Sequence, residues 1–530
     1  MRTRLLRQGV AGGLLGLSLL LQSGMGMAEQ SASAQELLAT RCAACHQAEG
    51  DDKYSRISYQ RKTPEGWLMT IGRMQTAHKV QLTDEERRTL IKYLADKQGM
   101  APSETADYRY ALERRLNTQE TLMEDPQLGE MCVRCHSGGR LAMQGRTEQE
   151  WRHLVNFHLG HWPALEYQAF SRDRNWFPIA INETVPHLAK RFPLESEAWF
   201  QWLQQRPDSE TLAGRWIFTG HYPGKGELTG SMTAKYIGED NFEVRVDGRY
   251  ADGTPFVGTG KAVVHNGYEW RANVEVDGTV LRQVFAVVNN EMTGRMFERD
   301  HDERGLDFRA VPDSAAAVVA VQPAYLKVGE QQELTLTGSG LNGTPQLGEG
   351  IEVIKVLDSS PERVRVQVRV AADAPVGVRE VAVGDADGAT LAIYRQISEV
   401  RVVPDYAVAR IGGNGSPTEK VEGHFDAEAW AIGEDGKTPY RIGFVPATWS
   451  VEAFDEEAEQ LEDVKYAGVM DRHTGVFVPG DAGPNPDRKM MANNVGNLKV
   501  IATVDEGGNT VTGEGQLIVG VQRWVIPPIP

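Results

Sequence analysis

A chain of 530 residues is too long for a single hydrophobic core, so we expect it to divide into three to five domains. Its formal net charge of −17 argues against a nucleic-acid partner and favours solubility. An acidic surface also suits a basic protein partner or a cationic substrate, although acidic surfaces are common in exported proteins.

The N-terminus has the pattern of a secretory signal. Three arginines in the first seven residues form a basic segment, and an apolar run from Val10 to Leu21 follows. This run is too short to span a bilayer, and no later segment is apolar for long enough. We therefore expect residues 1–28 to be a signal peptide, cleaved after Ala28 or as late as Ala34, and no membrane anchor in the mature protein.

All four cysteines fall in two Cys-x-x-Cys-His motifs, Cys42-Ala-Ala-Cys45-His46 and Cys132-Val-Arg-Cys135-His136. This spacing is the attachment pattern of a c-type haem, in which two thiols bind the porphyrin and the histidine becomes the proximal iron ligand. A four-ligand zinc site or two disulfides are the alternatives, but zinc knuckles need no histidine directly after each second cysteine. We therefore predict two covalently bound haem c groups and a role in electron transfer.

The region before about residue 205 has helical patterns and holds seven of the twelve histidines. One helix is expected to begin at Thr83, whose capping box is completed by Glu86, and to end at Gly99. We expect residues 29–204 to form an all-α dihaem cytochrome c domain. Covalent haem attachment takes place outside the cytoplasm, so the haem motifs and the signal both predict a periplasmic protein.

A c-type haem usually takes a second axial ligand, most often Met or His, and an internal duplication narrows the choice here. Each haem motif is followed by a threonine, a tryptophan four residues later, and a possible iron ligand seven residues after that. These residues are Thr63, Trp67 and Met74 in the first copy, and Thr147, Trp151 and His158 in the second. Seven residues advance a helix by about two turns, so the tryptophan and the ligand share one face. We predict Met74 for the iron bound to His46, and His158 for the iron bound to His136.

Other histidines compete with this assignment. His78 lies on nearly the same helix face as Met74, but its counterpart in the second copy is Trp162, which cannot bind iron. A helical methionine is also more often part of a hydrophobic core than a ligand. His161 and His153 compete with His158, although His153 points away from the apolar stripe. His78 and His161 therefore stay open as alternative distal ligands.

After about residue 205 the sequence changes to short alternating strands, separated by Asp-Gly and Asn-Gly pairs at hairpin spacing. We expect three all-β domains: a small barrel or sandwich at 205–313, an immunoglobulin-like sandwich at 314–402, and a C-terminal sandwich at 403–530. The segment from Leu334 to Leu341 resembles immunoglobulin-like modules. None of the three domains contains a catalytic type of cluster, so their expected role is scaffold or subunit contact.

The order of a signal, two haem motifs and three β domains resembles the large α subunit of quinohemoprotein amine dehydrogenase. The resemblance spans the mature chain and includes Arg61–Trp67, Tyr93–Gln98, Leu154–Leu159 and His301–Asp307. The haem motifs alone are not specific, since many cytochromes share them, but their combination with the β domains is.

This resemblance implies a heterotrimer that oxidises primary amines to aldehyde and ammonia in the periplasm. Its partners would be a β-propeller subunit and a small γ subunit that carries a cysteine tryptophylquinone. Electrons would pass from that quinone through the α-subunit haems to a soluble acceptor, such as a blue-copper protein or cytochrome c. The quinone needs a cysteine of its own, and all four cysteines here are committed to haem. We therefore expect no catalytic residue in this chain, which would relay electrons while another polypeptide performs the amine chemistry.

Two other functions fit parts of the sequence. A dihaem c-type peroxidase also has two haem motifs, but one iron must be open to peroxide. A stand-alone dihaem cytochrome could instead use the β domains as binding modules. Peroxide turnover would identify the first, and co-purification with two specific subunits would favour the dehydrogenase over both.

Overall fold

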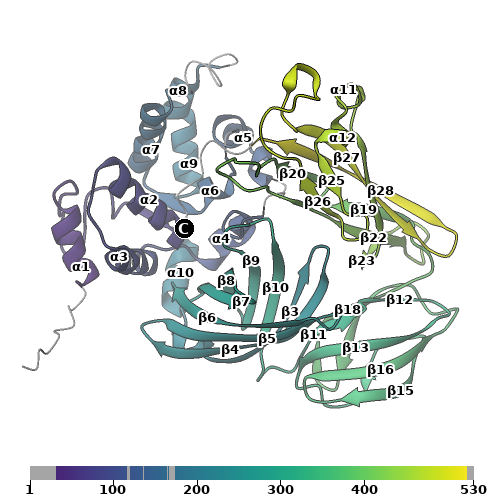
Figure 1. Ribbon diagram of the computed structural model, residues 1–530. Helices are drawn as coiled ribbons and strands as arrows, with labels where there is room; N and C mark the ends of the chain where they lie inside the picture. Colours follow the sequence, from purple (N-terminus) through teal and green to yellow (C-terminus); the bar gives the residue numbers. More distant parts are fainter. Residues whose placement is uncertain (1–31, 116–119, 135, 164, 166–173, 522–530) are drawn as a thin grey trace, which may run out of the picture.

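The computed structural model describes residues 32–115, 120–134, 136–163, 165 and 174–521, so the expected signal peptide and Cys135 lie outside the described residues. Figure 1 shows four units in chain order: a mainly helical unit, a closed barrel and two further β units. No helix among the described residues is both long and apolar enough to cross a membrane.

The helical unit has two hydrophobic cores, one for each copy of the duplicated sequence. In the first copy α2 packs on α3 around Trp67 and Leu90, and in the second α7 packs on α9 around Trp151 and Leu188. The helices and helical turns are α1 (Ala34–Leu37), η1 (Leu38–Cys42), α2 (Pro64–Ala77), α3 (Asp84–Lys97), α4 (Pro102–Thr105), η2 (Ala106–Ala111), η3 (Thr121–Glu124), α5 (Pro126–Met131), α6 (Gly139–Ala142), α7 (Glu148–His161), α8 (Trp176–Ile179), η5 (Ala180–Thr184), α9 (Val185–Arg191), α10 (Glu197–Gln205) and η6 (Ser209–Leu212).

The longer helices begin at capping residues that can be recognised in the sequence. The Thr83 hydroxyl accepts from Glu86 N at 3.1 Å, and the Glu86 carboxylate accepts from Thr83 N at 2.8 Å. The predicted capping box at the start of α3 is therefore confirmed. Thr63 and Thr147 cap α2 and α7, and each hydroxyl accepts from the N–H three residues later.

The expectation of an all-α N-terminal domain is wrong, because two short strands join the two copies. β1 (Gln60–Lys62) pairs antiparallel with β2 (Gln144–Arg146), and Arg61 lies opposite Gly145. Each strand directly precedes the threonine that caps α2 or α7, so the extended chain entering each helix is used for pairing. Three polar residues are too few to show the alternation of a strand, and only the contact between copies creates the sheet. Of the residues that the structure describes, 43% are in strands and 25% in helices.

The second unit is a closed barrel in the strand order β10-β3-β4-β5-β6-β7-β8-β9. Aromatic side chains fill its interior: Phe285 and Phe308 stack with ring centroids 4.3 Å apart, and Phe218 lies 5.0 Å from Phe308. Side chains that point inward and outward alternate along β5, as the sequence pattern predicts. The strands are β3 (Gly214–Tyr222), β4 (Gly226–Gly238), β5 (Asn241–Tyr250), β6 (Pro255–His265), β7 (Glu269–Val276), β8 (Thr279–Val288), β9 (Glu291–Glu298) and β10 (Gly305–Pro312).

The third unit contains one curved sheet in the order β14-β17-β18-β11-β13-β16-β15, with β12 paired to β18. Its core is mostly valine and leucine from alternating positions, such as Leu334, Leu336 and Val366. The strands are β11 (Ala317–Gln322), β12 (Tyr325–Lys327), β13 (Gln331–Ser339), β14 (Pro345–Gln346), β15 (Ile351–Ser359), β16 (Arg363–Val370), β17 (Gly377–Val383) and β18 (Ala386–Tyr394).

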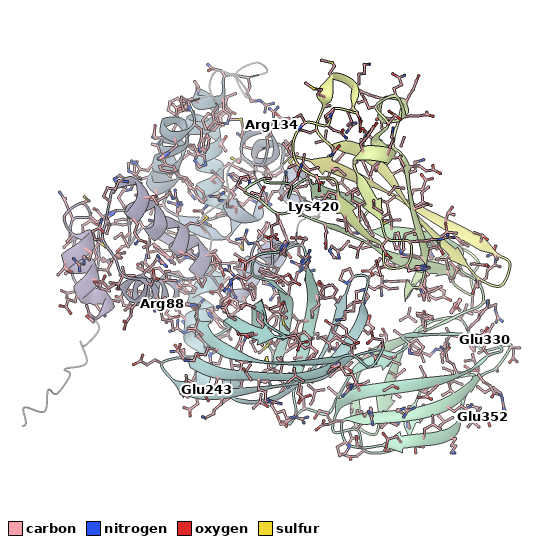
Figure 2. All side chains as sticks on the ribbon, in the orientation of Figure 1. Arg88, Arg134, Glu243, Glu330, Glu352 and Lys420 are labelled. Carbon is pink, nitrogen blue, oxygen red and sulfur yellow. The ribbon has the colours of Figure 1, made fainter. Side chains whose placement is uncertain are left out.

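The fourth unit combines three small sheets, in the orders β19-β22-β23, β20-β28-β27-β24 and β21-β26-β25, around a common core. Its elements are β19 (Glu399–Val403), β20 (Tyr406–Arg410), β21 (Gly423–His424), β22 (Asp426–Ile432), β23 (Pro439–Val445), β24 (Thr448–Ala453), α11 (Glu456–Gln460), α12 (Asp463–Tyr466), β25 (Gly468–Met470), β26 (Val476–Pro479), η7 (Lys489–Met491), β27 (Gly496–Asp505) and β28 (Thr510–Gly520). Acidic side chains project from the β units, as Figure 2 shows for Glu243 on the barrel and for Glu330 and Glu352 on the third unit.

Polar contacts hold the helical unit on the barrel. Arg271 of β7 pairs with Glu65 in the first turn of α2 at 2.6 Å. The side-chain amide of Asn266 donates to Met100 O at 2.6 Å. Because Glu65 belongs to α2, the barrel helps to fix the helix that carries Met74.

Candidate haem centres

The first Cys-x-x-Cys-His motif forms a tight turn that gathers its side chains. The N–H groups of Cys45 and His46 both donate to Cys42 O, at 3.1 and 2.9 Å. Cys42 is half-buried and Cys45 is exposed. Nδ1 of His46 lies 2.8 Å from Ser55 O, which leaves Nε2 as the nitrogen available for iron.

In the second motif, Cys132 follows the last residue of α5, and its N–H donates to Leu128 O at 2.8 Å. Burial raises the pKa of the Cys132 thiol to about 12, so the free thiol holds its proton at neutral pH. Cys135 lies outside the described residues. Among the residues that the structure describes, no three His, Cys, Asp or Glu side chains lie close enough together to hold a metal ion.

The second centre brings the side chains of His136 and His158 close together. Their ring centroids are 6.5 Å apart and their planes differ by 40°. An imidazole nitrogen binds a first-row metal at about 2 Å, so two rings on opposite sides of one iron have centroids roughly 6 Å apart. The spacing of this pair therefore fits a haem iron with two histidine ligands.

Hydrogen bonds orient both rings of this pair. Nδ1 of His136 lies 3.0 Å from Ser137 O, and Nδ1 of His158 lies 2.8 Å from Leu154 O, one turn earlier in α7. A carbonyl can only accept, so each Nδ1 carries the proton and each Nε2 keeps its lone pair. Burial lowers the pKa of both imidazoles, which favours the neutral form that binds metal.

The competing histidines of α7 have other contacts. His161 is exposed and its ring lies 4.2 Å from that of Phe157. Nε2 of His153 lies 3.2 Å from the side-chain amide of Gln149. No contact among the described residues joins either of them to His136.

Met74 and His78 both lie at the C-terminal end of α2. The Met74 side chain is half-buried, whereas His78 is exposed and forms the C-cap of the helix. Met74 O accepts from the N–H groups of His78 and Val80, both at 3.1 Å. Within the part of the chain that the structure describes, no contact joins Met74 or His78 to His46. The structure thus brings together one of the two predicted ligand pairs.

The two copies also touch directly beside the predicted distal ligands. The guanidinium carbon of Arg73 lies 4.9 Å from the ring centroid of Phe157. Arg73 precedes Met74 and Phe157 precedes His158, so the contact joins equivalent positions of the duplication. The Phe157 ring in turn lies 6.1 Å from that of His158, edge to face. Side chains next to both distal positions are therefore in van der Waals range of one another.

Two buried tryptophans explain why the distance along the chain from tryptophan to predicted ligand is the same in both copies. Trp67 and Trp151 are 1% and 0% exposed, and their ring N–H groups donate to Gln98 O and Phe192 O, both at 3.2 Å. Each tryptophan ring fixes the N-terminal part of its helix in the core, and the ligand position lies two helical turns further along. Sequence reasoning found these tryptophans but missed the carbonyls that orient the histidines. The bond to Leu154 follows a helical rule, whereas Ser55 lies in a loop whose path the sequence does not reveal.

Four family models match the chain, one after another. Residues 32–199 match the model described as "Quinohemoprotein amine dehydrogenase A, alpha subunit, haem binding". Residues 209–313, 315–395 and 400–529 match domains II, III and IV of the quinohemoprotein amine dehydrogenase alpha subunit. Together these matches cover nearly the whole chain. No sequence among the curated proteins matches it.

Parts of the chain are similar to solved structures. A de novo designed fluorescence-activating β-barrel is 23% identical over 20% of this chain and 98% of its own, with a TM-score of 0.18. Drosophila N-cadherin EC1-3 is 13% identical over 54% of this chain and 91% of its own, with a TM-score of 0.20. A Bacteroides ovatus protein, SGBP-B, in complex with a mixed-linkage heptasaccharide, is 10% identical over 58% of this chain and 64% of its own, with a TM-score of 0.18. Likenesses this weak carry no argument about function.

Proposed function

Since the chain belongs to the family of quinohemoprotein amine dehydrogenase alpha subunits, haem-binding subunits of an oxidoreductase, we propose that it transfers electrons through two covalently bound haem c groups. The observation that carries this proposal is the distance between the rings of His136 and His158, which is the spacing expected for two imidazoles on one iron. When bound, the haems supply one-electron chemistry between ferric and ferrous iron.

The proposed roles follow the two motifs. Cys42, Cys45, Cys132 and Cys135 form the thioether bonds; His46 and Met74 bind the first iron, and His136 and His158 bind the second. The carbonyls of Ser55, Ser137 and Leu154 keep the proton on Nδ1 of each histidine, so that Nε2 is free for iron. This chain binds and orients the haems, and its own side chains take no part in amine oxidation.

We place the quinone in another subunit, because the cysteines of this chain are all used in haem motifs. The proposed partners are a β-propeller subunit and a small γ subunit with a cysteine tryptophylquinone, which receives electrons from a primary amine. A soluble blue-copper protein or cytochrome c accepts the electrons that leave the haems. The N-terminal signal pattern and the haem chemistry support a periplasmic location.

Mass spectrometry and purification test this proposal. The denatured chain should retain the mass of two haems, and Cys42→Ala or Cys132→Ala should each weaken or remove the attachment of one haem only. Two specific small or medium-sized subunits should co-purify in equal amounts. A wild-type chain that carries one haem or none would end the proposal.

Activity assays distinguish the other candidates. Peroxide turnover by the isolated chain would favour a dihaem peroxidase, and a chain that purifies without subunits would favour a stand-alone cytochrome. The spacing of His136 and His158 argues against peroxide binding at the second iron, since both axial positions would be occupied.

A further inference from the structure

A group of cations lies between the two copies and has almost no counter-charge. We call it the ribbon cation cluster, because it surrounds the β1–β2 ribbon; its members are Arg56, Lys62, Arg73, Arg140 and Arg146. Arg140 acts electrostatically on Arg73, and Arg73 acts on Lys62 and Arg146. The five side chains therefore share one region of the helical unit.

Two members occupy equivalent positions of the duplication. Lys62 ends β1 and Arg146 ends β2, each directly before the threonine that caps the next helix. They are 3% and 5% exposed. Nζ of Lys62 lies 5.1 Å from the Trp67 ring centroid, and the Arg146 guanidinium lies 5.5 Å from that of Trp151. In each copy, one buried cation thus packs on the equivalent tryptophan. This cation lies the same number of residues before the predicted distal ligand in both copies.

The cluster has a single facing carboxylate, Glu150, which is 2.7 Å from Arg56 and 3.8 Å from Arg146. Lys62 donates to the Thr70 hydroxyl, and Arg73 Nε lies 3.4 Å from Met69 O. Within the described ranges, no carboxylate lies within ion-pair distance of Lys62, Arg73 or Arg140.

Two charged residues next to the cluster, Arg61 and Glu120, have partners outside it. Arg61, one residue before Lys62, makes two bonds of 2.8 Å to the carboxylate of Glu104. Glu120, near His136, accepts hydrogen bonds from the Tyr110 hydroxyl and from Gly138 N, and among the described residues it forms no ion pair with a member of the cluster.

Burying several cations with one carboxylate among them is costly, and the electrostatics of Lys62 and Arg146 reflect this cost. Burial and the neighbouring arginines hold the pKa of Lys62 well below its ordinary value. Burial likewise lowers the pKa of Arg146 to about 9, against the attraction of Glu150. An anion that entered this region would relieve both effects.

We propose that the ribbon cation cluster binds the propionate carboxylates of the two haems, an inference that rests on the proposed dihaem function. When a haem is bound, its propionates would need cationic partners among the side chains near the iron ligands. The ammonium of Lys62 reaches Thr70, one helical turn before Met74. Arg73 and Arg140 both act electrostatically on His158, and Arg140 also acts on His136. Arginine and lysine are the side chains that bind carboxylates most strongly, through charge-assisted hydrogen bonds.

Spectroelectrochemistry of the holoprotein tests the site with Lys62→Met and Arg146→Met. A nearby positive charge favours ferrous over ferric iron, so each variant should lower the midpoint potential of at least one haem. In reduced-minus-oxidised infrared spectra, bands of isotope-labelled propionates should shift in the same variants. The charge-retaining variants Lys62→Arg and Arg146→Lys should stay close to wild type in both measurements.

The matched control is Arg152→Gln, which removes a cation from α7 that already pairs with Glu148 at 3.5 Å. If a methionine variant does not fold, Arg73→Gln removes a half-buried member of the cluster and replaces it in the test. Potentials and propionate bands that change no more than in Arg152→Gln would overturn the inference, as would changed potentials with unshifted propionate bands. Haem content is measured in every sample, so a wild-type chain without two haems would overturn the proposed function itself.

Discussion

The Nδ1 atoms of His46, His136 and His158 face backbone carbonyls at 2.8, 3.0 and 2.8 Å. These carbonyls belong to a loop, to the following residue and to the preceding turn of a helix. Three different local structures thus select the same imidazole tautomer. Such selection suits a metal ligand, because the proton is held on one nitrogen and the other is presented to the iron.

Replacing His158 tests the distal ligand of the second haem. His158→Ala should let carbon monoxide bind the reduced second haem, because the side chain facing His136 is removed. Optical spectra of the reduced protein with and without carbon monoxide measure this. His161→Ala is the control, since His161 is exposed and its ring contacts Phe157. Carbon monoxide binding in His161→Ala but not in His158→Ala would reverse the assignment.

At the first haem the two candidates differ in burial, and their spectra differ too. Met74→Ala should abolish the near-infrared sulfur-to-iron charge-transfer band and leave the second haem unchanged. His78→Ala should preserve this band, because His78 is the exposed C-cap of α2. If the band survives Met74→Ala while His78→Ala alters the spectrum, the duplication has misaligned the first ligand.

At the scale of elements, capping chemistry made α3 predictable, because Thr83 and Glu86 satisfy free N–H groups from within one short segment. The position of His158 on the face of Trp151 also follows from helical period alone. The β1–β2 pairing could not be predicted, since Arg61 meets Gly145 only after both copies have folded. A Cβ atom at position 145 would lie 2.4 Å from Pro193 O, so this close approach of the backbone explains why the residue is glycine. No pattern in the sequence indicates this role.

Removing the N-cap of α7 should lower the stability of the folded protein. The Thr147 hydroxyl accepts from Glu150 N at 3.2 Å, so Thr147→Ala should lower the free energy of unfolding by about 1 kcal/mol. Urea unfolding, followed in the Soret band, measures the change. Thr76→Ala is the control, because the exposed Thr76 hydroxyl bonds only to carbonyls of its own helix. Equal effects of the two substitutions would contradict the role of the cap.

At the scale of the whole molecule, His221 joins the barrel to the fourth unit. It lies 2.7 Å from Glu227 of the barrel and 3.0 Å from Asp426 of β22, and its ring stacks on Phe444 at 4.5 Å. Burial opposes its charge, but the hydrogen bonds and charges of Asp426 and Glu227 outweigh burial and raise the pKa of His221 to about 10. The junction is therefore a charged one at neutral pH.

This raised pKa predicts how the junction depends on pH. A group whose pKa is higher in the folded state stabilises fully below its unfolded value of about 6.5 and loses that contribution as pH rises through the folded value. His221→Gln should therefore lower the thermal unfolding temperature most at pH values below about 6.5, and the difference from wild type should shrink as the pH rises towards about 10. The exposed His473→Gln is the control and should show no such trend. A difference that is constant with pH would contradict the charged junction.

The order of the two haems along the relay follows from their proposed ligands. Methionine raises the potential of a c-type haem relative to a second histidine, because a thioether favours ferrous iron. Arg73 lies at the contact between α2 and α7 and acts electrostatically on His158. Electrons should therefore pass from the quinone to the haem of His136 and His158, then to the haem of His46 and Met74, and on to the acceptor.

Met74→His tests this order in a spectroelectrochemical titration. It replaces the thioether by a second imidazole, so the higher of the two wild-type potentials should fall while the lower one stays in place. Met69→Leu is a suitable control, since Met69 lies on the same helix, away from the predicted ligand position. Should the lower wave move in Met74→His, the first haem would have the lower potential, and the proposed direction of electron flow through this subunit would be reversed.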